Sequence, residues 1–301
     1  METWYDMHCH LGFAPDPLAA AQAGAAAGIG AFSCTVTPAE YERLQPLLAP
    51  VPGVATGLGA HPWWIADGRV GEAELDTLCA LAPATRFIGE IGLDFAGPRN
   101  TAESRTRQVT AFERILSSCD APLVLVSSAQ SSLASSKASP TKDESDADVR
   151  ASDVGSLASV NNPAPDGDQA DKLISIHDVQ STGTVLDLLE AHGTCERHRC
   201  IFHWFSGTSD ELNRAIGLGC FFSVGPRMLA SRRGREYARQ IPLDRLLLET
   251  DMPSREGETL PASVWHAELN NALTGIAQLK NVDRDALAAQ LAATSAVLLG
   301  R

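Results

Sequence analysis

The sequence predicts an α/β protein built as a TIM-type (β/α)8 barrel, a closed parallel sheet surrounded by helices. Short apolar runs alternate along the chain with longer Ala- and Leu-rich segments, as in proteins whose parallel strands are joined by helices. Most of the apolar runs are nearly continuous, which is typical of strands buried on both faces. The length of 301 residues suits one such barrel, so we expect residues 1–301 to form a single domain.

Eight segments are expected to be strands: residues 4–10, 29–36, 54–61, 86–94, 172–177, 199–205, 220–225 and 245–251. Helical segments are expected between them, at residues 16–28, 37–49, 70–82, 106–118, 184–193 and 209–219. Residues 121–128 could compete for the fifth strand, but residues 172–177 are preferred because a histidine ends them and a helical segment follows. A doubly wound sheet shares the alternation but does not require eight units. The barrel is therefore the preferred interpretation.

Residues 129–171 differ in composition from the rest of the chain. They are rich in Ser, Ala and Asp, contain no aromatic residue and show neither helical nor strand periodicity. Such a segment has too little apolar surface to offset the entropy of ordering. We therefore expect a flexible, disordered low-complexity insertion within the barrel domain.

The overall composition excludes several classes of protein. A formal net charge of −13 argues against a broad nucleic-acid-binding face, but not against a local site where metal ions supply positive charge. Neither a signal peptide nor an apolar run long enough for a membrane helix is visible. The seven cysteines form no CxxC pair, which indicates reduced thiols in a cytoplasmic protein. No membrane association and no obligate protein partner are expected.

Histidines and acids gather at the predicted strand ends. His8 and His10 alternate in the first strand, so their side chains project from one face. The others belong to later strands: His61, Glu90, Asp94, His177, His203 and Asp251. In a barrel the carboxyl ends of all strands meet on one face, where active sites are built. Each residue alone could be a core histidine, a salt-bridge partner or a helix cap, but together they indicate a metal site.

Six of these residues have the donor atoms of a metal centre: His8, His10, Glu90, His177, His203 and Asp251. Four imidazoles and two carboxylates exceed what one tetrahedral ion needs and fit two ions that share a carboxylate. Such ligands suit Zn or Mn and tolerate Mg. Paired ions activate water for displacement at phosphorus or carbonyl carbon, so the sequence predicts a metal-dependent hydrolase. The remaining histidines, His192, His198 and His266, are expected at the surface.

Five segments carry a family resemblance: DMHCH, GAHPW, GEIGLDF, HWFSG and LLLETDMP. In this order they resemble the motifs of the TatD family of metal-dependent deoxyribonucleases, within the amidohydrolase superfamily. They span residues 6 to 253, nearly the whole chain. The resemblance implies a TIM-type barrel with one or two divalent metals that cleaves phosphodiester bonds at DNA ends.

The resemblance also implies a role for each metal-binding residue. His8, His10 and Glu90 would bind one ion. Glu90 would bridge to a second ion, which is held by His177 and His203. With Mg, Mn or Zn as the metal, the protein would use two divalent ions.

Other roles follow from the same motifs. Asp251 would ligate metal and act as general base toward the attacking water, which makes Asp251 and Glu90 the catalytic residues. His61 would lie near the substrate phosphate without binding metal, and Asp94 would orient one of the ligands. Trp63 and Trp64 could stack on a base or simply pack in the wall of the site.

Two departures from the family pattern affect the substrate rather than the metals. The family usually continues its fifth-strand histidine as H-x-R, but Val179 stands where the arginine would be. The last motif usually reads TDxPYL, and here it reads TDMPSRE. Arg227 and Arg255 are candidates for the missing cationic contacts.

Three functions are consistent with the sequence. The first is a nuclease acting on a DNA end. The second is a hydrolase of a small phosphoester, amide or lactone that uses the same ions. The third, disfavoured by an intact ligand set, is a non-catalytic protein that binds a partner through the acidic insertion.

Overall fold

The computed structural model describes residues 3–121 and 171–301. The predicted insertion lies outside the described residues except for its last residue, Asp171, and so does most of the competing segment 121–128. The described strands are β1 Trp4–Cys9, β2 Ile29–Cys34, β3 Val54–Gly57, β4 Phe87–Asp94, β5 Leu173–Val179, β6 Arg199–His203, β7 Phe221–Val224 and β8 Leu246–Leu248. The predicted choice of residues 172–177 for the fifth strand is thereby confirmed.

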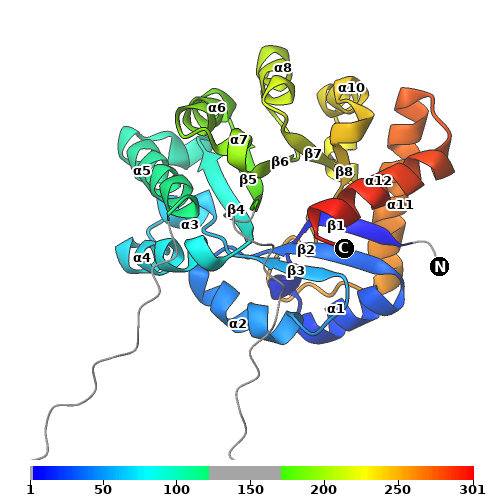
Figure 1. The fold of residues 1–301 in the computed structure, drawn as a ribbon, viewed down its shortest axis with the longest axis horizontal. Coiled ribbons are helices and arrows are strands. Elements are labelled where there is room, and N and C mark those ends of the chain that lie inside the picture. The colour runs from blue at the N-terminus through cyan, green and yellow to red at the C-terminus, as the bar shows by residue number, and fades with distance from the viewer. Residues whose placement is uncertain (1–2, 122–170) are drawn as a thin grey trace, which may run out of the picture. The chain divides into compact units, whose positions relative to one another are not determined.

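These strands form a closed parallel barrel (Figure 1). Parallel pairing runs from β1 to β3 and from β4 to β8. A parallel bridge between Leu58 and Ile88 joins the two groups. On the other side β1 lies beside β8, and the amide of Asp251 donates to the carbonyl of His8 at 3.0 Å. The predicted (β/α)8 fold is confirmed.

Helices surround the strands in Figure 1. They are α1 Pro17–Ala26, α2 Pro38–Leu48, α3 Pro62–Ala66, α4 Glu72–Leu81, α5 Ala102–Cys119, α6 Thr182–Ala191, α7 Thr194–Arg197, α8 Ser209–Gly217, α9 Pro226–Ala230, α10 Arg232–Gln240, α11 Ala262–Lys280 and α12 Arg284–Leu298. Several helices begin at residues that satisfy free amide groups. Asp16, Thr37 and Thr101 accept hydrogen bonds from the first turns of α1, α2 and α5, which stabilises each start by about 1 kcal/mol.

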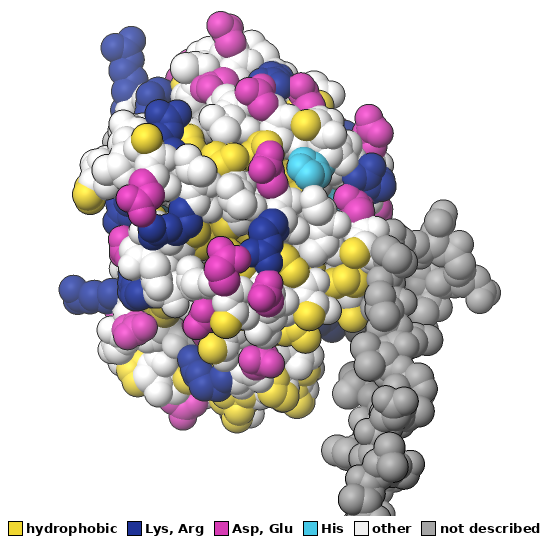
Figure 2. Space-filling model, turned by 90° about the vertical axis from the view of Figure 1, so that its left-hand side faces the viewer, with side chains coloured by type: hydrophobic (Ala, Val, Ile, Leu, Met, Phe, Trp, Pro, Cys, Tyr) yellow, Lys and Arg dark blue, Asp and Glu magenta, His cyan; other side chains and the backbone are white. Residues whose placement is uncertain are grey.

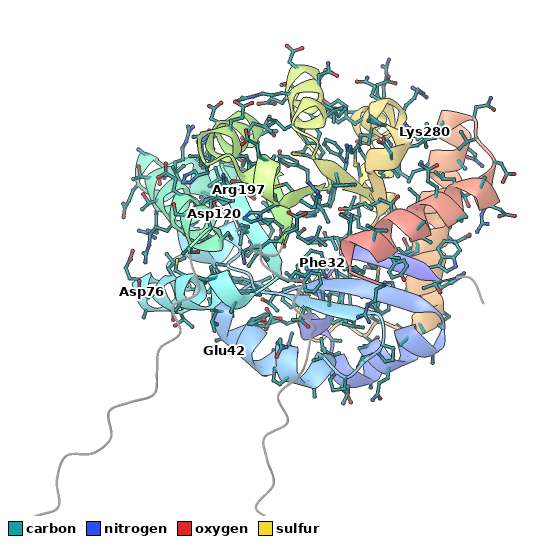
Figure 3. The ribbon with its side chains drawn as sticks, in the orientation of Figure 1. Phe32, Glu42, Asp76, Asp120, Arg197 and Lys280 are labelled. Carbon is teal, nitrogen blue, oxygen red and sulfur yellow. The ribbon has the colours of Figure 1, made fainter. Side chains whose placement is uncertain are left out.

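Two groups of buried apolar side chains hold the barrel together. The smaller group lies among the strands, around Met7, Phe32 and Leu247 (Phe32 is labelled in Figure 3). The larger group contains strand residues such as Ile88 and helix residues such as Trp265. Strand side chains alternate between the two groups, as the period of two requires, so each strand is buried on both faces.

The third strand ends earlier than predicted. It stops at Gly57 rather than at residue 61. Beyond it, the amide of Thr35 donates to Gly89 at 3.0 Å, and the amide of Glu90 donates to Thr35 at 2.8 Å. This pairing draws β2 toward β4 and takes the chain after Gly57 out of the regular ladder. His61 consequently caps α3 instead of ending a strand.

Candidate metal centre

Glu90 occupies the middle of the site, although it lies inside β4 rather than at its end. The pairing of β4 with β5 shifts register between Ile88 and Ile91, and such an irregularity re-aims the side chains near it. Glu90 is 1% exposed. Burial would raise its pKa, but His61, His203 and the other imidazoles around it hold the pKa well below the usual range.

Five histidines surround the Glu90 carboxylate. Oε1 lies 2.7 Å from His177 Nδ1, 2.9 Å from His203 Nε2 and 3.3 Å from His61 Nε2. Oε2 lies 3.4 Å from Nε2 of both His8 and His10. One ionised carboxylate therefore faces imidazoles contributed by β1 and the residue that follows it, by β5 and β6, and by the start of α3.

His8 of β1 and His10, which directly follows β1, are held by their Nδ1 atoms. His10 Nδ1 lies 3.0 Å from the carbonyl oxygen of Cys34. Because a carbonyl only accepts, Nδ1 carries the proton and Nε2 faces the centre of the site. His8 Nδ1 lies 2.7 Å from the hydroxyl of Ser175, which also turns its Nε2 toward Glu90.

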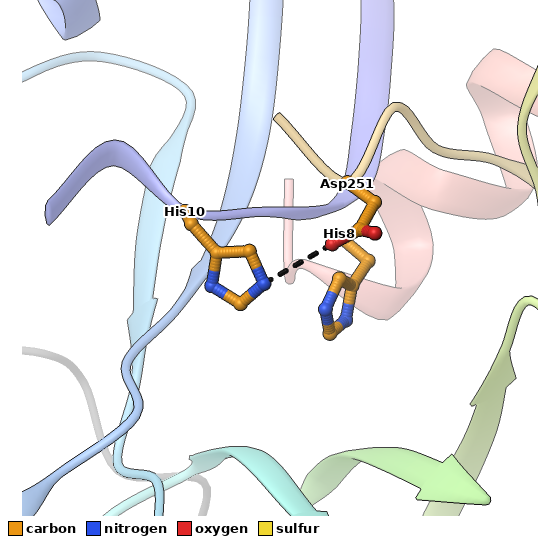
Figure 4. Close-up of side chains that lie close together, drawn as sticks. All are labelled: His8, His10 and Asp251. Atoms are coloured by element: carbon orange, nitrogen blue, oxygen red, sulfur yellow. Dashed lines mark ion pairs between the residues drawn. The ribbon is translucent and has the colours of Figure 1, made fainter. Parts of the chain in front are cut away.

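Asp251 completes the cluster from beyond β8. Its Oδ1 lies 3.2 Å from His10 Nε2, and Figure 4 shows this ion pair with His8 alongside. Its Oδ2 accepts from Arg227 Nη1 at 2.9 Å. Burial opposes ionisation, but the hydrogen bond with His10 and the charges nearby lower the pKa of Asp251 to about 2.

Asp94 contacts the ring nitrogen of His177 that does not face Glu90. His177 Nε2 is 3.3 Å from Asp94 Oδ2, and the Trp63 indole donates to the same oxygen at 2.5 Å. Burial opposes the charged imidazole, but the hydrogen bonds with Asp94 and Glu90 raise the pKa of His177 to about 10.

Three groups of side chains place their ligand atoms within 4.8 Å of one another: His8, His10 and Asp251; His8, Glu90 and His203; and His61, Glu90 and His177. Two atoms at the centre, His8 Nε2 and Glu90 Oε2, are buried and have no hydrogen-bond partner among the described residues. Buried polar atoms are normally satisfied, and a cation would satisfy both. The donor set therefore fits divalent metal ions.

All eight residues predicted for the site converge on one face of the barrel. His61 places a ligand atom within 4.8 Å of those of Glu90 and His177. The family resemblance implied for this residue a position near the substrate phosphate without a bond to metal.

A cavity of about 1270 Å³ opens above the cluster. Four arginines contribute to its lining: Arg69, Arg227, Arg233 and Arg255. Trp63 and Trp204 also line it and remain 41% and 36% exposed. Large apolar side chains exposed beside a polar cluster are typical of a binding site.

Several supporting residues escaped the sequence analysis. Asp6 accepts hydrogen bonds from the Trp265 indole at 2.6 Å and from the amide of Thr250 at 3.0 Å. Glu249 is buried and accepts from the Ser223 hydroxyl at 2.5 Å. In the sequence, Asp6 lies two residues before His8, and Glu249 lies two residues before Asp251. This spacing was the only indication of a supporting role, because a buried acid beside a candidate ligand needs a hydrogen-bonding or charged partner.

The prediction of a surface position for His198 was wrong. Its side chain is 3% exposed, and its Nε2 lies 3.1 Å from Asp120 Oδ1. Its Nδ1 also accepts from the amide of Lys172, the residue directly before β5, at 3.4 Å. His198 is therefore enclosed between the end of α5 and the start of β5.

Sequence comparisons relate the chain to known proteins. The family profile described as TatD related DNase matches residues 5–125 and 167–300. An Escherichia coli (strain K12) protein described as the uncharacterized metal-dependent hydrolase YjjV is 25% identical over 256 residues, covering 82% of this chain and 78% of that protein. The 3′-5′ ssDNA/RNA exonuclease TatD of Klebsiella pneumoniae (strain 342) is 33% identical over 108 residues, 33% of this chain and 41% of that protein.

Solved structures show the same fold. The Escherichia coli YjjV structure superposes with a TM-score of 0.69 at 19% identity, covering 98% of this chain and 97% of that one. A TatD-family hydrolase from Entamoeba histolytica superposes with a TM-score of 0.67 at 14% identity, covering 99% and 98%. No helix among the described residues is long and apolar enough to cross a membrane. Because the profile matches nearly the whole chain, the protein belongs to the TatD family of metal-dependent hydrolases.

Proposed function

We propose that this protein is a nuclease that removes nucleotides from DNA ends by metal-dependent hydrolysis of phosphodiester bonds. The observation that carries the proposal is the buried carboxylate of Glu90 facing five imidazoles, with two central atoms left without hydrogen bonds among the described residues. The exonuclease activity named for the Klebsiella relative supports a phosphodiester as the bond.

The proposed metal ligands are those expected from the sequence: His8, His10, Glu90, His177, His203 and Asp251. They would hold two divalent ions, Mg, Mn or Zn, with Glu90 shared between them. Ions bound there would lower the pKa of a water molecule and stabilise charge on the phosphoryl oxygens.

Asp251 is the proposed general base. Its low pKa keeps it ionised and able to accept a proton from the attacking water. His10 holds Oδ1 and Arg227 holds Oδ2, so both oxygens are fixed at the edge of the cavity. A base positioned in this way contributes roughly 10²–10⁴-fold to rate.

Arg227 also supplies the cationic contact that Val179 cannot make. Its guanidinium lies in the cavity beside Asp251, where a phosphate oxygen can accept from it. Arg69, Arg233 and Arg255 add positive charge around the same opening. On the face drawn in Figure 2, by contrast, basic and acidic side chains are interspersed. Binding of an anionic substrate is thus proposed to rest on the cavity rather than on a broad basic surface.

Trp63 and Trp204 are the proposed stacking surfaces for bases. Each keeps over a third of its side chain exposed at the cavity. Stacking of a base on an aromatic ring contributes about 1–3 kcal/mol, and it requires bases that are not paired. This favours single-stranded ends.

A small phosphoester, amide or lactone is the second candidate substrate. The observation in its favour is Val179, which brings no charge to the cavity. Acidic residues such as Glu211 and Glu256 also line the opening and would repel a long polyanion.

The cytoplasm is the proposed location. All seven cysteines of the chain are unpaired, and reducing compartments keep thiols in this state.

The test is hydrolysis of an end-labelled single-stranded oligonucleotide by the purified protein with Mg²⁺ or Mn²⁺. Stepwise shortening is expected, and it should be lost with chelator and in Asp251→Asn. No shortening by protein with measured bound metal would refute the nuclease. Turnover of a small chromogenic ester by the same sample would then establish the second candidate.

A further inference from the structure

Three cysteines lie together at the opposite ends of the strands from the metal centre. Cys200 is the second residue of β6, Cys220 directly precedes β7, and Cys195 lies in α7. The sulfur atoms of Cys195 and Cys220 are 3.6 Å apart. His203 ends β6, so the length of a strand separates this thiol cluster from the site of hydrolysis.

The three thiols differ in their surroundings. Cys200 and Cys220 are buried, whereas Cys195 is half-buried. Contacts with Cys200 and Cys220 lower the pKa of the Cys195 thiol, while the contact with Cys195, together with burial, raises the pKa of Cys220. A partly exposed thiol of low pKa beside a second thiol is typical of a redox-sensitive pair.

The geometry favours a reaction between two thiols over a metal site. Among the described residues, three or more side chains place metal-ligand atoms within 4.8 Å of one another only in the cluster around Glu90 and Asp251. The three sulfur atoms therefore do not converge on one point, as a thiolate-bound metal requires. Cys195 and Cys220, in contrast, are already in contact.

We propose that Cys195 and Cys220 form a reversible disulfide when the protein encounters a peroxide. The Cys195 thiolate attacks one peroxide oxygen, the O–O bond breaks, and hydroxide leaves as Cys195 becomes a sulfenic acid. The Cys220 sulfur then attacks the Cys195 sulfur, and the sulfenic hydroxyl leaves with the Cys220 proton as water. Overall, two thiols lose two electrons and two protons, and hydrogen peroxide becomes two waters.

The sulfur atoms must approach from 3.6 Å to about 2.05 Å. Cys195 can make this movement because its side chain is not fully buried and α7 is a single short turn, Thr194–Arg197. Cys220 is buried and directly precedes β7, so its sulfur is expected to move little.

The test treats the full-length, metal-loaded protein with hydrogen peroxide, blocks the remaining thiols by alkylation and maps the peptides by mass spectrometry. Two of the seven thiols should disappear with a mass loss of about 2 Da, in a peptide linking Cys195 to Cys220. Dithiothreitol should restore both. Circular dichroism before and after treatment checks that the fold persists, because unfolding would expose every thiol.

Three variants sharpen the test. Cys195→Ser should abolish the disulfide, and Cys220→Ser should leave a sulfenic acid at Cys195 that dimedone traps. Cys79→Ser is the matched control, because Cys79 is also half-buried but donates only weakly, to the Arg114 carbonyl at 3.9 Å; it should behave like the wild type. Seven free thiols after treatment of folded wild type would overturn the proposal, as would a disulfide from Cys195 to Cys200.

Discussion

Replacing Glu90 by Gln tests the centre of the proposed metal site most directly. The change keeps the shape of the side chain but removes the negative charge that five imidazoles face within 3.4 Å. Glu90 belongs to two of the three groups whose ligand atoms lie within 4.8 Å. Its substitution should therefore weaken both proposed metal positions at once.

The size of the effect follows from the position of the carboxylate. Loss of a residue that merely orients a ligand costs about 10–100-fold in metal affinity. Glu90 makes contact from both of its oxygens, so we expect at least the upper end of this range. That is roughly 100-fold, or about 2.7 kcal/mol of binding free energy.

The matched control is Glu249→Gln. Glu249 is also 1% exposed and close to the site, but its carboxylate lies 3.8 Å from His203 Nδ1 and is bonded to Ser223. Burial raises the pKa of Glu249 well above its usual range, so we expect loss of its charge to matter less than loss of the charge of Glu90. Gln in its place should change little.

The assay measures metal content after dialysis against graded metal buffers, together with hydrolysis by the loaded protein. Circular dichroism should show a folded barrel for both variants. Glu90→Gln should lose metal and activity, and Glu249→Gln should keep both. Equal metal affinity in wild type and Glu90→Gln would refute the shared role of this carboxylate, whatever substrate the enzyme proves to use.

Three further outcomes are expected. Arg227→Gln should raise KM for an oligonucleotide about tenfold, as expected for loss of a charge-assisted hydrogen bond, and an unchanged KM would contradict the phosphate contact. In chelated protein the raised pKa of His177, from the ordinary 6.5 to about 10, stabilises the fold below pH 6.5. This contribution should fade as pH rises toward 10, and urea unfolding at pH 6, 8 and 10 should show a larger decline for wild type than for His177→Gln. Deletion of residues 131–169 should leave folding and metal content intact, and metal loss would count against the independence of the barrel. The flanks are held from outside the segment, because Arg197 donates to both oxygens of Asp120 at 2.7 Å (Figure 3) and Arg199 pairs with Asp171.

The strands and the site could be predicted because burial on both faces leaves a strong signal. When a strand is buried on both faces, a His or Asp near its end needs a hydrogen-bonding or charged partner. The barrel topology brings the carboxyl ends of all the strands to one face. This logic found His8, His203 and Asp251 without any knowledge of distances. It also found Glu90, although Glu90 does not lie at a strand end.

Local departures from regular geometry could not be predicted. The register shifts of β1 between Asp6 and Cys9 and of β4 between Ile88 and Ile91 change where side chains point, and strand periodicity assumes that such shifts are absent. The burial of His198 depends on a contact with Asp120, which lies 78 residues away. Composition carries no record of such a partner.

The closure of the barrel explains how residues from the two ends of the sequence share one site. The carboxylate of Asp6 in β1 accepts from the Trp265 indole of α11 and from the amide of Thr250, 244 residues away. The amide of Asp251 donates to the carbonyl of His8 at 3.0 Å. These bonds fix β1 against the segment after β8, so the distances from His8 and His10 to Asp251 depend on a carboxylate outside the proposed ligand set. Burying a carboxylate such as that of Asp6 costs free energy unless its oxygens accept hydrogen bonds. The donors come from α11 and from the segment after β8, so the bonds that stabilise Asp6 form only when β1 and this segment come together, as the site also requires.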